Sequence, residues 1–275
     1  MERIREAIRM AKAQRKGGDP MPSISMPMPA EFATDDRREM PGREMRARTV
    51  LKIDRNHLEA NRIISPQVGN PQAAAFDMLR TKVLQEMDEQ GWQVLVMTSP
   101  SVGCGKTMSS INLALSISRQ PDRSVYLIDL DFRKPKVAFT LGVTPEHDIS
   151  NVIKGEADLE DALFNIDLAG PQLTILANRQ SIKHPSEAIG SRQIKSMFDM
   201  IRSESGKPII IVDMPPVLIT DDVLAFLPQA DCCILAVAEG LSTVSEVDSS
   251  EKLLTGTNYL GCILTKSSER SATYY

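Results

Sequence analysis

Six short runs of aliphatic and β-branched residues recur from residue 93 onward in this 275-residue chain, and they constrain its fold more than any other feature. The runs are QVLVMTS, SVYLIDLD, QLTILAN, PIIIVDM, DCCILAVA and LGCILTK. Helical patterns lie between them, for example over Thr107–Arg119, Ser191–Ser203 and Ser242–Leu254. Apolar strands that alternate with helices are typical of a parallel sheet covered on both faces. We therefore predict an α/β fold with a doubly wound, mostly parallel sheet and helices on both faces.

The first fifty residues have a different composition from the rest of the chain. Residues 1–16 place Ile4, Ile8 and Ala11 on one side of a helical pattern, among six Lys and Arg residues. This pattern fits either a short solvated helix or a basic amphipathic element that docks on a membrane surface or a partner. The Pro- and Met-rich stretch that follows is typical of a flexible linker. We predict an N-terminal segment over residues 1–50, one α/β domain over residues 51–268 and a tail over residues 269–275.

The overall composition is that of an ordinary globular protein of the cytoplasm. The net charge of -4 gives the whole molecule no general attraction for nucleic acid. The four cysteines show no CxxC spacing, which favours a reducing compartment. No apolar run approaches the roughly 20 residues that a membrane-spanning helix needs. We expect any contact with a membrane to be peripheral, through a partner or through the N-terminal helix.

A glycine-rich stretch, SPSVGCGKT, follows the first predicted strand and precedes a predicted helix. Gly103 and Gly105 would let the backbone approach a phosphate, with N–H groups converging at a helix N-terminus. Lys106 would contact phosphate oxygens, and the Thr107 hydroxyl would bind Mg²⁺. The same letters could form a plain strand–helix turn, but the strand and helix around them favour a phosphate-binding loop.

Acidic residues end two further predicted strands. Asp129 and Asp131 close the run VYLIDLD and are followed by Arg133, and Asp213 closes the run IIIVD. In open α/β sheets, ligands bind outside the carboxyl ends of the strands, so these acids should share a crevice with the glycine-rich loop. Carboxylates beside a phosphate loop suit Mg²⁺ and its water ligands, and they can also accept a proton.

The motifs SPSVGCGKT, LIDLDFRKP and IIVDMPP, in this order, resemble the Walker A, Walker A-prime and Walker B motifs of the bacterial tyrosine kinases. These are autokinases of exopolysaccharide and capsule assembly, related in fold to the MinD/ParA class of phosphate-loop ATPases. The resemblance covers roughly residues 70–268 and is closest to the exosortase-associated type. It implies an ATP-dependent protein-tyrosine kinase that regulates exopolysaccharide polymerisation or export.

The resemblance assigns roles to the residues of the three motifs. It gives Lys106 to the phosphates of ATP and Thr107 to Mg²⁺. It gives Asp129 and Asp131 to the Mg²⁺ shell and to the base that takes the tyrosine proton, without dividing these roles. Asp213 would hold the metal through water.

The same comparison extends to the neighbours of these residues. Gly103, Cys104, Gly105 and Met108 would line the nucleotide together with Lys106 and Thr107. Arg133 would fix either the strand-end carboxylates or the phosphates. Cys104 has two interpretations: a small residue at a variable position of the loop or, since it precedes a helix, a reactive thiol.

Members of the resembled family phosphorylate a tyrosine cluster in their own C-terminal tail, usually on a neighbouring subunit of a ring. Two of the four tyrosines of this chain, Tyr274 and Tyr275, are its last residues, whereas Tyr126 and Tyr259 lie in predicted strands. The terminal pair is expected to accept phosphate, although two terminal aromatic residues could also pack on the domain. The implied partners are further copies of the chain and a transmembrane adaptor of the chain-length-determinant type, which would place the protein at the inner face of the cell membrane.

The chain departs from the family pattern at several positions. Where the ring-forming helix usually carries one acid and two arginines three apart, this sequence has Ala74, Asp77 and Arg80. Thr265 stands where the last strand often ends in an asparagine near the adenine. These departures leave open a regulatory ATPase switch of the ParA/MinD type with little kinase activity.

Two other functions on the same fold find less support. A ParA/MinD-type switch uses an extra lysine early in the loop, where this chain has Ser101 after Pro100. An iron–sulfur reductase needs cysteines that bridge two subunits, and the adjacent Cys232 and Cys233 lie within one predicted strand. The tyrosine kinase therefore remains the leading interpretation.

Overall fold

The computed structural model describes residues 48–64, 71–168 and 173–267 of the chain. The helix predicted within residues 1–16, the linker after it and the two terminal tyrosines lie outside the described residues. The boundaries placed at residues 50 and 268 therefore stay predictions. In the part of the chain that is described, no helix is long and apolar enough to cross a membrane.

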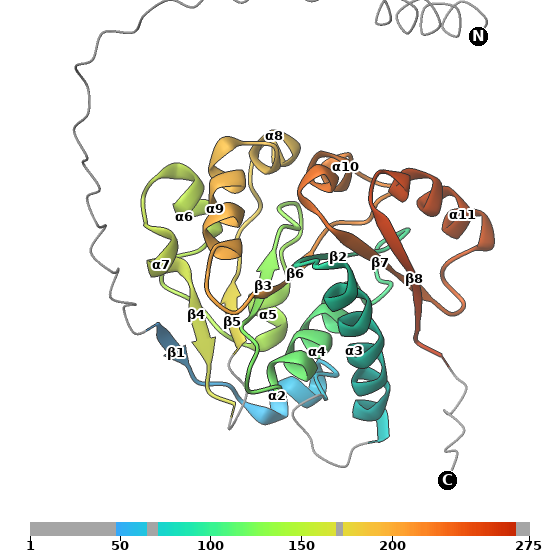
Figure 1. Cartoon of the computed structure of the whole chain (residues 1–275), viewed down its shortest axis with the longest axis horizontal. Helices are drawn as coiled ribbons and strands as arrows, with labels where there is room; N and C mark the ends of the chain where they lie inside the picture. The colour runs from blue at the N-terminus through green and yellow to red at the C-terminus, as the bar shows by residue number, and fades with distance from the viewer. Residues whose placement is uncertain (1–47, 65–70, 169–172, 268–275) are drawn as a thin grey trace, which may run out of the picture. The chain divides into compact units, whose positions relative to one another are not determined.

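One mixed sheet forms the centre of the described residues (Figure 1). Its strand order is β1-β4-β5-β3-β6-β2-β7-β8, and every neighbouring pair is parallel except β4 and β5. The strands are β1 (Thr49–Leu51), β2 (Val94–Thr98), β3 (Val125–Asp129), β4 (Phe164–Ile166), β5 (Leu173–Leu176), β6 (Ile209–Asp213), β7 (Cys232–Ala238) and β8 (Asn258–Thr265). The predicted mostly parallel α/β sheet is confirmed.

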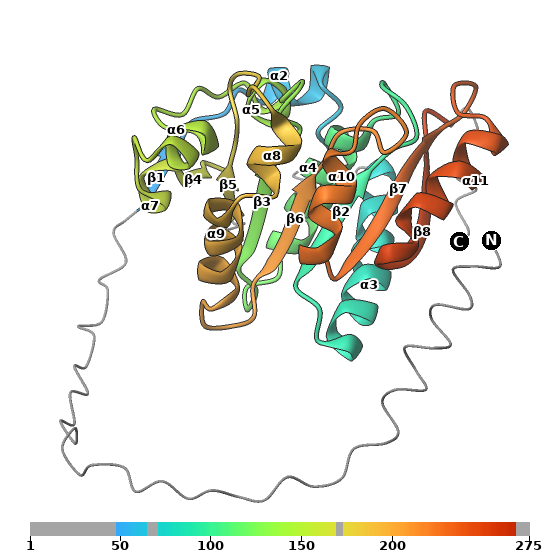
Figure 2. The ribbon, with the colours of Figure 1, turned by 90° about the horizontal axis from the view of Figure 1, so that it is seen from above.

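Helices cover both faces of this sheet (Figure 2). One face packs against α2 (Arg55–Ala60), α3 (Pro71–Gln90), α4 (Lys106–Ser118) and α5 (Val137–Leu141). The other face packs against α6 (Ile149–Lys154), α7 (Leu159–Ala162), α8 (Pro185–Ile189), α9 (Arg192–Arg202), α10 (Asp222–Phe226) and α11 (Val244–Leu253). The five central strands are almost fully buried because helices cover them on both sides, which explains their continuous apolar sequences.

Helix α9 shows how the sequence pattern produces this packing. Its buried side chains, Ile194, Met197, Phe198 and Ile201, recur at the three- and four-residue spacing of one helical face. The Ser191 side chain caps its first turn by accepting from the N–H of Ile194. The apolar face contacts the sheet, and the polar residues between these positions face solvent.

Two short strands were not predicted from the sequence. β1 and β4 have three residues each, which is too few for a periodic pattern to appear. β1 pairs with β4 in parallel, and β4 pairs with β5 in the antiparallel sense. Their extended conformation depends on pairing with distant parts of the chain, so local propensity does not reveal it.

Arg48, which directly precedes β1 at the edge of the sheet, forms hydrogen bonds with side chains of the interior strands β3 and β5. The Arg48 side chain is 14% exposed, and its Nη1 donates to Thr174 Oγ1 at 3.0 Å. Its Nη2 donates to the Tyr126 hydroxyl at 2.8 Å and to Glu204 Oε1 at 3.1 Å. The Tyr126 hydroxyl in turn donates to Glu204 Oε2 at 2.5 Å. Because four residues share this network, loss of the arginine leaves a carboxylate and a phenol with fewer partners.

We predict that Arg48→Ala lowers the free energy of unfolding by about 1–3 kcal/mol, because charge-assisted hydrogen bonds in a half-buried network are lost together. Urea denaturation of the purified protein measures this change. Arg55→Ala, on the exposed first turn of α2, is the matched control and should change stability by less than about 0.5 kcal/mol. Equal effects of the two variants would contradict the anchoring role of Arg48.

Candidate functional site

The glycine-rich loop lies between β2 and the N-terminus of α4, as the sequence predicted. Gly103 and Gly105 both have φ of +82°, a backbone conformation that side chains with a Cβ rarely adopt. In the described part of the chain, the amide N–H groups of Gly103, Cys104 and Gly105 donate to no protein acceptor. Unpaired amides at the start of a 13-residue helix suit an anion such as phosphate.

The first half of the loop is attached to the turn after β6. Thr98 Oγ1 donates to the Pro215 carbonyl at 2.7 Å, and the N–H of Val217 donates to the Ser99 carbonyl at 2.9 Å. Pro100, which departs from the usual glycine, is buried in this region. The hydrogen bonds that fix this turn come from the Thr98 hydroxyl and the Val217 N–H, and neither uses an N–H at position 100, which proline lacks.

The three motifs meet because their strands are neighbours. β3, β6 and β2 lie side by side in the sheet, with Asp129 paired in register with Asp213, and Asp213 with Met97. The carboxyl ends of parallel strands meet at one edge, so the glycine-rich loop, Asp129, Asp131 and Asp213 are brought together there.

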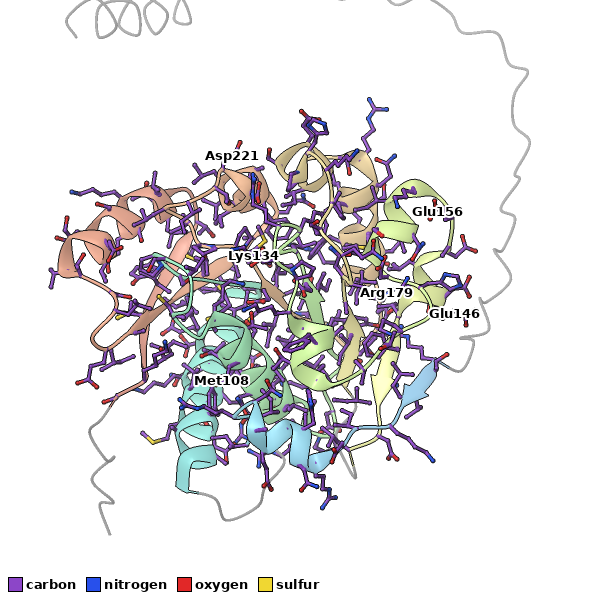
Figure 3. All side chains as sticks on the ribbon, turned by 180° about the vertical axis from the view of Figure 1, so that it is seen from behind. Met108, Lys134, Glu146, Glu156, Arg179 and Asp221 are labelled. Atoms are coloured by element: carbon purple, nitrogen blue, oxygen red, sulfur yellow. The ribbon has the colours of Figure 1, made fainter. Side chains whose placement is uncertain are left out.

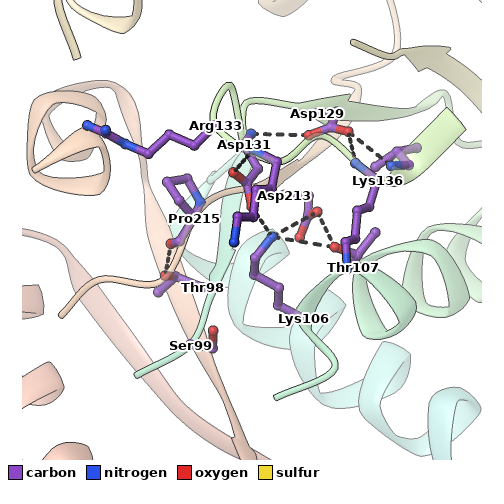
Figure 4. A network of polar contacts seen from close by, with 12 residues as sticks. Thr98, Ser99, Lys106, Thr107, Asp129, Asp131, Arg133, Lys136, Asp213 and Pro215 are labelled. Atoms are coloured by element: carbon purple, nitrogen blue, oxygen red, sulfur yellow. Dashed lines mark hydrogen bonds and ion pairs between the residues drawn. The ribbon is translucent and has the colours of Figure 1, made fainter. Parts of the chain in front are cut away.

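Lys106 lies between two of the three acids (Figure 4). Its Nζ is 2.8 Å from Asp131 Oδ2 and 3.3 Å from Asp213 Oδ2. Thr107 Oγ1 donates to Asp213 Oδ2 at 2.6 Å, and Ser110 Oγ donates to Asp213 Oδ1 at 3.2 Å. Ser110 was not predicted, because a serine one helical turn after Lys106 carries no signal of its own in the sequence.

Burial and charge shape the ionisation of this cluster. Burial opposes the charge of Lys106, but the Asp213 and Asp131 carboxylates outweigh it and hold the lysine pKa above its usual value. Burial raises the pKa of Asp213, against the lowering effect of Lys106 and Thr107. Burial and the charge of Asp213 raise the pKa of Asp129 to about 8. The Lys106 ammonium therefore offsets the negative charge of more than one buried carboxylate at this edge of the sheet.

Asp129 differs from the other two acids in what it contacts. Its Oδ1 accepts from the N–H of Asp131 at 3.1 Å, and its Oδ2 accepts from the N–H groups of Lys136 and Val137 at 3.0 Å each. Both carboxylate oxygens thus bind the backbone of the segment from the loop after β3 to the first residue of α5 (Figure 4). The Asp131 carboxylate accepts from the N–H of Lys134 through Oδ1 and keeps Oδ2 for Lys106.

Arg133 is paired with Asp222, an acid that lies outside the three motifs. Its Nε donates to Asp222 Oδ2 at 2.8 Å and its Nη2 to Asp222 Oδ1 at 3.1 Å, a two-pronged contact with a fully buried carboxylate. In Figure 4 the Arg133 side chain extends away from Lys106. The arginine thus links the loop after β3 to the start of α10 and does not contact Lys106 or Asp213.

Cys104 and Met108, the other residues predicted to line a nucleotide, have buried or partly buried side chains. The Cys104 side chain is 1% exposed, with its Sγ 3.6 Å from Ser101 Oγ and 3.4 Å from Ser242 Oγ. The Met108 side chain packs against the apolar cluster on the α3 and α4 side of the sheet (Figure 3). Either residue could meet a ligand in the loop through its backbone. The Cys104 side chain is closed to solvent, whereas the Met108 side chain is only partly buried.

The positions where the sequence departs from the family pattern make contacts within the chain. Arg80 Nη1 donates to Asp77 Oδ1 at 3.0 Å and to the Ser116 carbonyl at 3.1 Å. Asp77 also pairs with Arg119 and accepts from Ser116 Oγ, so the acid ties α3 to α4. Thr265 Oγ1 donates to the Cys104 carbonyl at 2.7 Å, which brings the end of β8 against the glycine-rich loop.

The acids do not form a preformed metal cage. Within the described residues, no group of three or more His, Cys, Asp or Glu side chains is arranged to hold an ion. Mg²⁺ commonly takes only one or two carboxylates and completes its shell with water and phosphate oxygens. The paired oxygens of Thr107 and Asp213, 2.6 Å apart beside the loop, fit that mode of binding.

Comparisons with known proteins were made by sequence and by structure. No family model matches the chain. The tyrosine-protein kinase Etk of Escherichia coli K12 is 28% identical over 213 residues, which are 76% of this chain but only 29% of Etk. The tyrosine-protein kinase CpsD of Streptococcus agalactiae serotype Ia is 27% identical over 202 residues, which are 72% of this chain and 84% of CpsD. The chain thus spans less than a third of Etk and most of CpsD.

Solved structures give the same result for the fold. The kinase domain of VpsO superposes with a TM-score of 0.62 at 29% identity, covering 70% of this chain and 94% of that domain. A chain of the MinC:MinD cell division protein complex of Aquifex aeolicus superposes with a TM-score of 0.52 at 24% identity, covering 62% of this chain and 68% of that chain, and it shows a shared fold only. The resemblance predicted from the three motifs is confirmed: the chain is similar in sequence to proteins named tyrosine-protein kinases, and it shares the fold of the VpsO kinase domain.

Proposed function

We propose that the chain is an ATP-dependent protein-tyrosine autokinase that regulates exopolysaccharide polymerisation or export. The observation that carries the proposal is the position of Lys106, held between Asp131 and Asp213 beside unpaired amides of the glycine-rich loop. The names of the relatives Etk and CpsD support tyrosine as the acceptor. The reaction joins a tyrosine oxygen to the γ-phosphorus of ATP, and ADP leaves.

The phosphate side of the reaction is assigned to the loop and to α4. The amides of Gly103, Cys104 and Gly105 and the start of α4, at Lys106 and Met108, bind the phosphates through the backbone. The Lys106 ammonium is bound by Asp131 and Asp213. A small movement of its side chain would let it leave one carboxylate and bind a phosphate oxygen instead. Bound Mg²⁺ would supply charge that offsets the phosphates, and Thr107 and Asp213 are the residues that would hold it.

The acceptor side of the reaction is assigned to Asp131. Its Oδ2 faces Lys106, whereas both oxygens of Asp129 are engaged by the backbone of the following loop. We therefore assign to Asp131 the role of accepting the tyrosine proton. We assign to Asp129 the role of holding the loop after β3 in shape, and it would contribute to the metal site only indirectly, through Asp131 and water. The Arg133–Asp222 pair holds the same loop from its other side.

The proposal includes the ends of the chain and its partners. Residues 51–268 form the catalytic domain, Tyr274 and Tyr275 accept phosphate, and residues 1–50 connect the domain to a peripheral membrane position. A transmembrane adaptor of the chain-length-determinant type and further copies of the chain are the partners. Because Asp77 binds Arg80 and Arg119 within the chain, contacts between copies would use other surfaces than these side chains.

We predict that the purified full chain, incubated with ATP and Mg²⁺, carries phosphate on Tyr274 or Tyr275, as mass spectrometry of the C-terminal peptide would show. Lys106→Met should reduce this phosphorylation at least about 100-fold, because the cation that meets the developing charge is lost. Lys195→Met, on the exposed face of α9, is the matched control and should leave phosphorylation unchanged.

A different outcome would replace the proposal by the ATPase switch. ATP consumption by the unmodified chain, with no phosphotyrosine on any peptide, would mean that the site hydrolyses ATP without acting as a kinase. Phosphotyrosine that persists in Lys106→Met would show that the phosphate site lies elsewhere.

We predict that Asp131→Asn acts on the chemistry of the site and Asp129→Asn on the stability of the fold. Asp131→Asn should lower the rate of phosphorylation about 100-fold or more, because the proton acceptor is lost. Asp129→Asn should lower the free energy of unfolding by about 1–3 kcal/mol, because an amide nitrogen replaces an oxygen that accepts backbone N–H groups. If Asp131→Asn retains full activity, the assignment of the base is wrong.

A further inference from the structure

We propose that Thr265 and Ser242 are positioning residues of the phosphate loop, which hold Cys104 from two sides and thereby turn the Gly105 amide toward the phosphate. This inference rests on the proposed nucleotide site. It assigns a positioning role to Cys104, which the sequence left as either a small residue at a variable position or a reactive thiol, and to Thr265, which the sequence linked only to recognition of the base.

Thr265 holds the backbone of Cys104. Its hydroxyl donates to the Cys104 carbonyl at 2.7 Å, with the Val237 carbonyl a longer second acceptor at 3.2 Å, and the side chain is buried. The peptide that joins Cys104 to Gly105 is trans, so its N–H points away from its carbonyl. With the carbonyl directed toward β8, the Gly105 N–H faces the opposite side, where it has no protein acceptor among the described residues. Thr265 thus sets the direction of an amide that the proposed phosphate needs.

Ser242 holds the side chain of Cys104. Its Oγ lies 3.4 Å from Cys104 Sγ, and it accepts from the N–H of Ala238 at 3.2 Å. The thiol is 1% exposed, so it serves as a buried contact of the loop and not as a surface thiol. The serine is fixed to the end of β7, which gives the Cys104 side chain a rigid neighbour.

The segments that carry these two residues are joined to each other and packed against the loop. The N–H of Glu239 donates to the Thr265 carbonyl at 3.0 Å, so the end of β8 and the turn after β7 form one unit. A Cβ placed on Gly105 would lie 3.5 Å from atoms of the Thr265 side chain, and one on Gly103 would lie 3.6 Å from Leu241 Cδ2. Gly103 and Gly105 therefore both pack against this unit, which supports the backbone of the phosphate loop.

The test compares Thr265→Val, which keeps the shape and removes the hydroxyl, with Thr265→Ser, which keeps the hydroxyl. We expect the dissociation constant for ADP and Mg²⁺ to rise about tenfold in Thr265→Val and to return near the parent value in Thr265→Ser. In the nucleotide-free protein, the loop is followed by amide hydrogen exchange at Ser109, whose N–H donates to the Gly105 carbonyl at 3.0 Å. This exchange should accelerate by a similar factor in Thr265→Val but not in Thr265→Ser. Ser242→Ala should change both readouts in the same direction by a smaller factor.

Thr257→Val is the matched control, because Thr257 Oγ1 also faces a backbone carbonyl, that of Ala230, at the far end of the same strand pair. It should leave ADP affinity and loop exchange unchanged. If Thr265→Val binds ADP as tightly as the parent and its loop exchanges at the parent rate, the positioning role is wrong. If the parent protein binds no ADP, the proposed nucleotide site fails, and the exchange measurement still decides whether Thr265 holds the loop.

Discussion

The contact of one lysine with two buried carboxylates is the interaction on which the rest of the domain depends. Lys106, Asp131 and Asp213 have side chains that are 11%, 6% and 0% exposed, so each charge must have a partner close by. Such a contact is possible only if β2, β3 and β6 are neighbours and end at the same edge of the sheet. Helices on both faces then keep water away from the strands below the cluster.

The surrounding polar residues hold the backbone in place instead of facing a ligand. Asp129 binds three amides of the loop after β3, and Asp222 holds Arg133 of that same loop. Thr265 and Ser242 hold the glycine-rich loop at Cys104. The site therefore consists of a few side chains that can meet a nucleotide and a larger number that fix the two loops around it. This arrangement agrees with a reaction in which positioning and charge provide most of the rate.

Much of the fold could be predicted from local patterns, and the prediction failed where pairing decided the structure. The six apolar runs correspond to β2, β3, β5, β6, β7 and β8. Helices bury the first five of these strands on both faces, whereas β8 lies at the edge of the sheet and is mostly exposed or half-buried. The three-residue strands β1 and β4 carry no such pattern.

The same distinction applies to the site. The sequence predicted that Lys106, Thr107, Asp131 and Asp213 meet, since each ends or follows a strand, and the structure brings them together. Which carboxylate binds the backbone could not be predicted, nor could the Arg133–Asp222 and Thr265–Cys104 contacts. Residues 89 and 161 positions apart form these contacts, and no local pattern encodes them. The N-terminal helix and the terminal tyrosines lie outside the described residues, so these predictions stay open.

A crystal structure of the protein with ADP and Mg²⁺ would test the central claim most directly. The account predicts the β-phosphate within the loop of residues 101–107, with the amides of Gly103 to Lys106 directed toward it. Lys106 Nζ should lie on a phosphate oxygen, and the Thr107 hydroxyl should lie on the metal. A nucleotide bound away from this loop, or Lys106 still held by both Asp131 and Asp213 with no phosphate contact, would contradict the account.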